Sequence, residues 1–221
     1  MTHPLASVVS ALRSDQQQLR AIAQNVGGLG QAGFKRILDA TAVEQGAAAV
    51  DLRDGPLVAT GGVLDLALEN NGFFALAEAD GSEVLTRAGR FRLDAEGHVV
   101  DPAGRRLLTD SGALRLAHGQ VEIDHQGRLR QNGADLGQLA IRRPLSALER
   151  IDGDPVNFRA ATTEPAEGYR VHQRHIESAN VDGATEMVRM IELSRHVESV
   201  QRALSIYDRA LDSGINRLGD A

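Results

Sequence analysis

Apolar residues near both ends of the chain recur at intervals that alternate between three and four residues. This heptad pattern places them along one side of an α-helix and is typical of helices that pair as a coiled coil. The first set consists of Leu5, Val8, Leu12, Asp15, Leu19, Ile22, Val26 and Leu29, with Asp15 as its polar member. The last set consists of Met190, Leu193, Val197, Val200, Leu204, Tyr207, Leu211, Gly214 and Leu218, and Met187, Ile191 and Ile215 widen it. The sequence therefore predicts one long helix at each end, ended by the glycines at 27–33 and by Gly219.

Two interpretations of these apolar stripes are open. The helices could pack on the protein's own core, or the two chain ends could form a coiled coil that includes helices from other copies. A buried Leu or Ile contributes about 1.5–3 kcal/mol, and two helices that face only each other cannot bury every member of both sets. We favour the coiled coil, with all the apolar members above except Leu29, Ile191 and Ile215 as the predicted subunit interface. Copies that repeat head to tail without closing would form an open filament.

The middle of the chain has a different pattern, because between Gly72 and Gly133 a glycine follows every six to nine residues. Five of these glycines form turn pairs with a preceding polar residue, namely Asn71-Gly72, Asp80-Gly81, Glu96-Gly97, Gln126-Gly127 and Asn132-Gly133. Short apolar stretches lie between the turns, which predicts an all-β domain of short antiparallel strands. The Ala-rich and Pro/Thr-rich segments on either side predict extended connectors. The fold class is therefore α+β, with paired terminal helices. The predicted parts are a helix at 1–32, a connector at 33–54, the β domain at 55–145, a connector at 146–180 and a helix at 181–221.

Charge and composition exclude several classes of function. Lysine and arginine number 24 against 30 aspartate and glutamate, a formal net charge of −6, whereas nucleic acids and anionic membranes need a basic face. Lys35 is the only lysine, and the absence of cysteine excludes disulfides, thiolate nucleophiles and cysteine zinc sites. No apolar run is long enough to cross a membrane, and residues 1–4 lack the pattern of a signal peptide. We predict no nucleic-acid partner and no membrane insertion.

Three groups of residues could carry chemistry, and each has a simpler explanation. Residues 28–33 have the G-x-G-x-x-G spacing of a dinucleotide-binding loop, but they follow a predicted helix where that loop needs a strand. His172 and His175, with Glu177 nearby, could hold a metal, yet arginines flank them and no third ligand has matching spacing. Four acids could supply an acid–base pair, but acids near turns are ordinary: Asp65, Glu69, Asp94 and Asp124. We predict no catalytic site, cofactor or metal, and therefore no enzyme.

Several short motifs occur along the chain in a fixed order. The first, N-(L/V)-A-N-x-x-T-x-G-(F/Y)-(K/R), is matched by Asn25, Val26, Gly33, Phe34 and Lys35, with departures at Gly27, Gly28 and Gln31. The second, T-G-x-x-L-D-x-A-I-x-G-x-G-F-F, is matched by Thr60, Gly61, Leu64, Asp65, Gly72, Phe73 and Phe74. The third, T-R-x-G-x-F-x-x-D-x-x-G, is matched by Thr86, Arg87, Gly89, Phe91, Asp94 and Gly97. Near the end, Asn180-Val181 and residues 186–191 match S-N-V and E-M-V-x-M-I. Together these motifs resemble those of the axial rod and hook proteins of the bacterial flagellum.

The resemblance implies a structural subunit of the flagellar basal-body rod, which transmits torque from motor to hook and performs no turnover. It implies that the terminal helices form an inner tube, that the β domain forms an outer wall, and that Gly33-Phe34 is the corner between helix and connector. It also implies export by the flagellar type III apparatus without a cleaved signal peptide, assembly in the periplasm, and partnership with further copies and with other rod and hook proteins. The chain length favours a rod protein, and the proximal rod component fits best, with the distal one next.

Three other functions are open. The chain could be a distal rod or hook-type axial subunit, or a β-domain binding module that contacts rod proteins without polymerising. It could also be a nucleotide-dependent enzyme that uses the glycines of residues 28–33.

Overall fold

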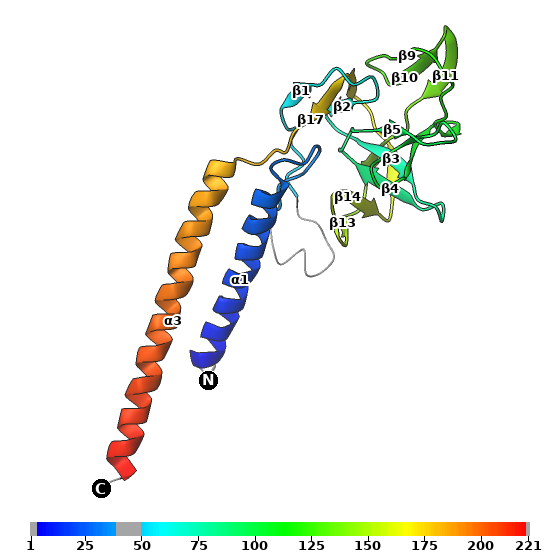
Figure 1. Cartoon of the computed structure of the whole chain (residues 1–221). Helices are drawn as coiled ribbons and strands as arrows, with labels where there is room; N and C mark the ends of the chain where they lie inside the picture. Colours follow the sequence, from blue (N-terminus) through cyan, green and yellow to red (C-terminus); the bar gives the residue numbers. More distant parts are fainter. Residues whose placement is uncertain (1–3, 39–49, 220–221) are drawn as a thin grey trace. The chain divides into compact units, whose positions relative to one another are not determined.

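A computed structural model of the chain describes residues 4–38 and 50–219, and it divides into two compact units (Figure 1). The first unit comprises Met1–Val26 together with Asp182–Ala221, and the second comprises Gly27–Val181. The two ends of the chain therefore form one unit and its middle forms the other. Residues 39–49, part of the connector predicted at 33–54, lie outside the described residues.

Each end of the chain forms a single long helix, as the heptad pattern predicts. Helix α1 runs Pro4–Gly28 and helix α3 runs Gly183–Gly219. Asp182 begins α3 as an N-cap, because its Oδ1 accepts the backbone N–H of Ala184 at 3.1 Å and its Oδ2 accepts the Thr185 hydroxyl at 2.6 Å. The hydrogen bond from the Thr185 hydroxyl has the largest effect on the Asp182 carboxyl, and together with the backbone hydrogen bonds it holds the pKa of that group below its usual range.

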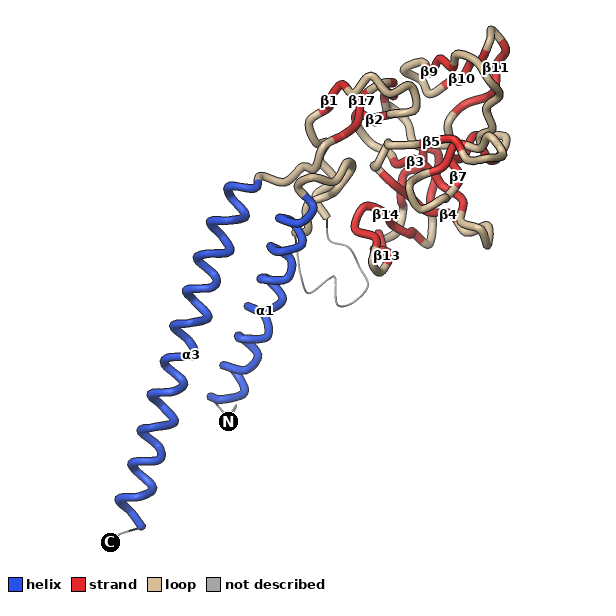
Figure 2. Tube along the Cα trace, viewed as in Figure 1, coloured by secondary structure: helices blue, strands red, loops and turns tan. Residues whose placement is uncertain are grey.

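The two helices lie side by side and antiparallel (Figure 2). Among the described residues, two polar contacts show where the helices meet. Near the end of α1, Asn25 donates from Nδ2 to Oε2 of Glu186 at 3.4 Å. Further from that end, Oδ2 of Asp15 lies 3.6 Å from Nε2 of His196. Both contacts join one residue of α1 to one residue of α3.

The apolar stripes of the helices are only partly covered. Ile22 is buried, whereas the other described members of the two sets are half-buried: Val8, Leu12, Leu19, Val26, Met190, Leu193, Val197, Val200 and Leu204. Five further apolar residues of the helices are more than half exposed: Val9, Met187, Val188, Ile191 and Ile206. The side chains of Leu5, Tyr207, Leu211 and Leu218 lie outside the described part of the structure.

The middle unit consists of short strands joined by tight turns. The strands are β1 Leu57–Ala59, β2 Leu66–Glu69, β3 Phe73–Ala77, β4 Glu83–Thr86, β5 Arg92–Leu93, β6 Val99–Val100, β7 Arg106–Thr109, β8 Gly112–Ala113, β9 Val121–Ile123, β10 Arg128–Gln131, β11 Ala134–Gln138, β12 Ile141–Pro144, β13 Leu148–Ile151, β14 Asp154–Ala160, β15 Thr163–Pro165, β16 Arg170–Gln173 and β17 His175–Glu177. Their pairings are antiparallel.

A ten-stranded sheet forms the centre of this unit. Its main path runs β13-β14-β4-β3-β7-β6-β5, while β12 pairs with β3 and β15, and β8 pairs with β7. The smaller sheets have the orders β11-β10-β9, β16-β2 and β1-β17. The largest hydrophobic cluster takes residues from several of these sheets, including Leu68, Phe74, Leu107, Leu129 and Val171. Phe74 and Phe91 meet edge to face within it, with ring centroids 5.6 Å apart.

The predicted α+β class with a central antiparallel β domain is confirmed. The structure differs at 146–180, predicted as a connector, because this segment contains strands β13 to β17. The strands β13 and β14 extend the ten-stranded sheet past β4 and bury Leu148 and Phe158. The described part of 33–54 also contributes to the core, since Phe34 and Ile37 are buried. None of the described helices is long and apolar enough to span a membrane.

Candidate functional site

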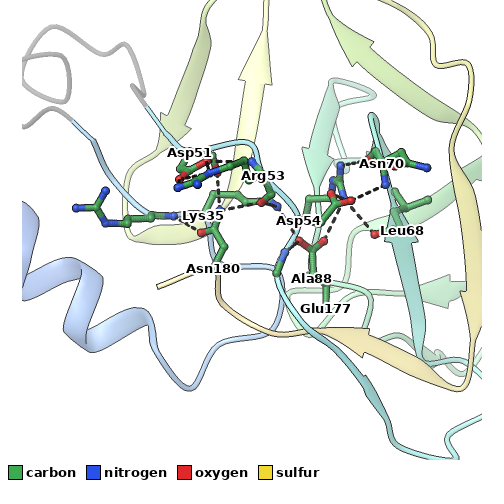
Figure 3. Close-up of polar contacts among 12 residues, drawn as sticks. Lys35, Asp51, Arg53, Asp54, Leu68, Asn70, Ala88, Glu177 and Asn180 are labelled. Carbon is green, nitrogen blue, oxygen red and sulfur yellow. Dashed lines mark hydrogen bonds and ion pairs between the residues drawn. The ribbon is translucent and has the colours of Figure 1, made fainter. Parts of the chain in front are cut away.

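Four charged side chains from distant parts of the sequence meet inside the middle unit (Figure 3). We call this group, Lys35, Asp54, Arg87 and Glu177, the joint cluster. Nζ of Lys35 lies 2.6 Å from Oε1 of Glu177, and both side chains are 1% exposed. Nη1 of Arg87 lies 3.1 Å from Oε2 of Glu177 and 3.2 Å from Oδ1 of Asp54. Buried charges are costly unless they are paired and hydrogen-bonded, so the pairing keeps this arrangement stable.

Backbone groups satisfy much of the remaining hydrogen-bonding capacity of the Lys35–Glu177 pair. Lys35 donates from Nζ to the carbonyl oxygen of Arg53 at 2.8 Å. Oε1 of Glu177 also accepts the backbone N–H of Gly55 at 2.8 Å. Burial lowers the pKa of the Lys35 amine, an effect that the Glu177 carboxylate opposes. Because both side chains are covered, no substrate reaches them, and the arrangement acts as a clamp between segments.

Arg87 joins the cluster to the turn after β2. Its Nη1 donates to the carbonyl oxygen of Leu68 at 3.2 Å, and its Nη2 donates to the carbonyl oxygen of Asn70. The guanidinium carbon lies 5.4 Å from the ring centroid of Phe73, a cation–π distance. The planar, multiply donating guanidinium can bind a carboxylate and backbone carbonyls together, which an ammonium group does less well.

The joint cluster lies on the two segments that lead to the helices. Gly33, five residues after the end of α1, donates its backbone N–H to the carbonyl oxygen of Glu177 at 2.7 Å. Asn180, three residues before α3, donates from Nδ2 to the carbonyl oxygens of Asp51 at 2.7 Å and Arg53 at 2.8 Å. Its Oδ1 accepts the backbone N–H of Arg36 at 2.7 Å. The segment after α1 and the segment before α3 are therefore fastened to each other inside the middle unit.

Close backbone packing at this place requires glycine. Gly33 has φ +70°, and a Cβ there would lie 2.2 Å from the backbone nitrogen of Ala88. At Gly55 a Cβ would lie 2.0 Å from the carbonyl oxygen of Ser178. Next to Gly33, the buried ring of Phe34 packs under Arg150, whose guanidinium carbon is 5.3 Å from the ring centroid. Burial lowers the pKa of Arg150 from its usual value.

The structure brings together motif residues that are far apart in the sequence. Gly33, Phe34 and Lys35 of the first motif meet Arg87 of the third and Asn180 of the last. The other motif residues lie elsewhere. Those in or beside the strands of the middle unit are Leu64, Asp65, Gly72, Phe73, Phe74, Thr86, Gly89 and Phe91. Asn25 lies on α1, and Val181 is the last residue of the middle unit.

Sequence reasoning missed three members of this site. Glu177 was considered only as a companion of two histidines, and Asp54 and Arg150 were not singled out. Acids and arginines at such positions look like solvated surface residues, and only the fold reveals that they are covered. The one usable signal was that Lys35 is the sole lysine and immediately follows a motif glycine.

Two of the groups considered for chemistry take part in the local structure of the chain. Residues 28–33 form the turn that ends α1, where Gln31 donates its N–H to the Gly28 carbonyl at 3.0 Å, and no strand precedes them. The interpretation as a helix-ending turn is confirmed. Nε2 of His172 lies 2.9 Å from Oε2 of Glu69, while Glu177 is engaged in the joint cluster. The carboxylate of Glu177, which was considered as a companion of the two histidines, is therefore occupied by Lys35 and Arg87.

The acids beside turns serve local backbone structure. Oδ1 of Asp94 accepts the N–H groups of Glu96 and His98, at 3.0 and 2.7 Å. Oδ1 of Asp124 accepts two backbone N–H groups in the same way. Oδ2 of Asp65 accepts the hydroxyl of Thr60 at 2.5 Å. Within the described residues, ligand atoms of three possible metal-binding side chains come close together only at Asp94, Glu96 and His98, which lie within one turn; Glu96 is exposed and the other two are half-buried.

The sequence of this chain is similar to those of known proteins over most of its length. The family model described as the flagellar hook protein FlgE/F/G D1 domain matches residues 67–141, and that described as the flagellar basal body rod FlgEFG protein C-terminal matches residues 172–218. The flagellar basal-body rod protein FlgF of Caulobacter vibrioides is 33% identical over 172 residues, which cover 75% of this chain and 69% of that relative. The chain belongs to the flagellar rod and hook protein family. FlgF of Rhizobium meliloti is 27% identical over 225 residues, covering 92% of each chain. The flagellar basal-body rod protein FlgG of Agrobacterium fabrum is 30% identical over 172 residues, covering 70% of this chain and 64% of the relative.

Family membership confirms the predicted likeness to FlgF first and FlgG next. It makes the chain a structural flagellar protein, not an enzyme, and implies assembly with other rod and hook proteins. In this chain, the joint cluster connects the two regions that the family models match. Arg87 lies within residues 67–141, Glu177 lies within residues 172–218, and Lys35 lies before both.

Proposed function

We propose that this chain is a rod subunit that polymerises through α1 and α3, paired as a coiled coil, and that the resulting rod transmits torque from motor to hook. The observation that carries the proposal is the incomplete burial of the apolar stripes on both helices. Described seam residues on α3, from Met190 to Leu204, are half-buried at best, and Met187 and Ile191 are more than half exposed. Burying such residues stabilises association by about 25 cal/mol per Å² of apolar surface.

The joint cluster supports a mechanical role for the subunit. A rod that transmits torque must resist deformation within each of its subunits. Inside the β-rich unit, the chain has paired buried charges, glycine contacts without space for a side chain, and the buried ring of Phe34. We assign Gly33-Phe34 as the corner residues of this joint, the helical unit to an inner layer of the rod, and the β-rich unit to an outer layer.

The rest of the proposal concerns where the subunit goes and whom it meets. We propose export through the flagellar type III apparatus without a cleaved signal peptide, and assembly in the periplasm with further copies and with other rod and hook proteins. Long helices whose apolar sides are half exposed suit this route, because isolated helices are marginal in water and become stable on association.

The test is Leu204→Asp, which puts a charge on the seam of α3. We expect the wild-type chain to show a rise in helical circular dichroism together with a rise in sedimentation coefficient as its concentration increases. The variant should show neither rise, while its β-rich unit keeps the wild-type hydrogen-exchange protection. Gln201→Asp is the matched control, because Gln201 is an exposed residue of α3 that lies close to Leu204. This variant should assemble like the wild type.

Two results would contradict the proposal. One is a wild-type chain that stays monomeric with both helices fully formed at all concentrations tested. The other is Leu204→Asp restoring motility to a strain that lacks the gene, since a subunit that polymerises through this seam could not do so. The second result would favour a β-domain binding module that contacts the rod without polymerising.

A further inference from the structure

The seam of α1 contains one charged residue that the heptad pattern alone does not explain. The side chain of Asp15 is 13% exposed, and no described residue donates a hydrogen bond to its Oδ2. Nε2 of His196 on α3 lies 3.6 Å from this oxygen. A carboxylate so placed contributes less to stability than an apolar residue would, because its desolvation is only partly compensated. Its presence therefore calls for a role other than packing.

The contacts between the helices define the partner of each seam position. Ten residues separate Asn25 from Asp15, and ten separate Glu186 from His196, so both contacts belong to one antiparallel register. If the register is shifted by one residue, each seam position of α1 from Val8 to Ile22 is matched with a seam position of α3. Extended along both helices, this shifted register would pair Val8 with Leu204, Leu12 with Val200, Leu19 with Leu193 and Ile22 with Met190. It would also place Asp15 opposite Val197, the neighbour of His196.

A second partner competes for the seam of α1, namely the same seam on another copy. Half-exposed heptad residues favour pairing between copies, and two α1 helices in parallel would match every apolar residue with itself. In that arrangement Asp15 would face Asp15 of the other copy. Two carboxylates in an apolar seam repel each other and lose hydration.

We propose that Asp15 is a specificity-determining residue that directs the seam of α1 towards α3 and prevents parallel pairing of α1 with α1 of another copy. The inference rests on the proposed coiled-coil pairing of the two helices. An element that penalises the wrong partner is as effective for specificity as one that favours the right partner. In a chain that polymerises, stray α1 dimers would withdraw subunits from assembly.

Engineered cysteines test the proposal in the full chain, which has no cysteine of its own. The single variant Leu19→Cys reports parallel α1 pairing, because the two copies of residue 19 then meet and form an intermolecular disulfide. The double variant Leu19→Cys, Leu193→Cys reports pairing of α1 with α3 through an intramolecular disulfide. In the Leu19→Cys chain, adding Asp15→Leu should raise the disulfide-linked dimer fraction about tenfold under a mild oxidant, the factor that 1.4 kcal/mol represents. Adding Gln16→Leu, at an exposed residue beside the seam, should leave it unchanged.

Each outcome decides between the alternatives. A rise with Asp15→Leu alone supports the proposal. Equal rises with both leucine variants would show general stickiness, and no rise with either would show that Asp15 excludes nothing; both results overturn the proposal and leave the proposed function intact. Failure of the double-cysteine chain to form its intramolecular disulfide, with helical circular dichroism unchanged, would instead overturn the α1–α3 pairing on which the proposed function depends.

Discussion

Glu177 is the residue on which the joint cluster depends most, because it balances two cations at once. Its carboxylate contacts Lys35 and Arg87 and accepts the backbone N–H of Gly55. Removing one partner of a buried ion pair leaves an uncompensated charge, and this costs more than the pair itself contributes. At this site the loss would leave two cations with only Asp54 as a carboxylate partner.

Glu177→Gln should therefore lower the free energy of unfolding of the β-rich unit by about 3–5 kcal/mol. Urea unfolding followed by circular dichroism measures the change. The matched control is Glu164→Gln, which breaks a contact with Arg143 whose side chains are 35% and 55% exposed. Exposed ion pairs contribute about 0–1 kcal/mol, so the control should remain close to wild type. Equal losses of unfolding free energy in the two variants would show that burial of the joint cluster does not increase its contribution to stability.

At the residue scale, sequence reasoning found the cluster only in part. Lys35 and Arg87 belong to motifs and were identified from them, although nothing in the sequence showed that they share a carboxylate. That carboxylate, Glu177, is 142 residues away from Lys35 along the chain. Local patterns report which residues share a helix face or a turn, and they do not report which distant segments meet.

At the scale of elements, the helices were predictable because their signals are local. Heptad spacing and the glycines at 27–33 and 219 placed α1 and α3 to within a few residues. The strands β13 and β14 were missed, and the segment was assigned to a connector. Their sequence, with Asp152-Gly153 between them and Pro155 in β14, lacks a regular alternation of apolar and polar residues. What makes them strands is pairing with each other and with β4, a tertiary effect.

The turn between α1 and the β-rich unit can be tested by comparing two of its glycines. Gly33→Ala should destabilise the β-rich unit, because a positive φ costs an alanine about 1–3 kcal/mol and the overlap with the Ala88 backbone adds about 1–3 kcal/mol. Gly30→Ala is the control, since a Cβ there meets nothing within 4 Å, and its effect should stay within about 1 kcal/mol. Thermal unfolding of both variants measures the difference. If Gly33→Ala left the thermal unfolding unchanged, the backbone at this corner would accommodate a side chain without cost, contrary to its proposed mechanical role.

At the scale of the whole molecule, the decisive feature is that the only lysine of the chain is fully covered. Lys35 is 0% exposed in the folded protein, so its amine meets reagents only when the joint opens. Burial also lowers its pKa below the usual 10.5. The unfolded chain therefore binds this proton more readily, and the contribution of Lys35 to stability increases as pH rises towards 10.5.

Acylation of the amine thus reports on the folding state of the β-rich unit. In native buffer the peptide containing Lys35 should remain unmodified by an amine-reactive ester, and in urea it should be modified quantitatively, as measured by mass spectrometry. Arg92→Lys supplies an internal reference, because it places a lysine at an exposed position of β5 in the same chain. That lysine should react in both conditions. The proposed export requires an unfolded chain, so we expect a chain trapped during export to be modified at Lys35, and an assembled subunit to be protected. Modification of Lys35 at the rate of the reference lysine in native buffer would contradict the closed joint.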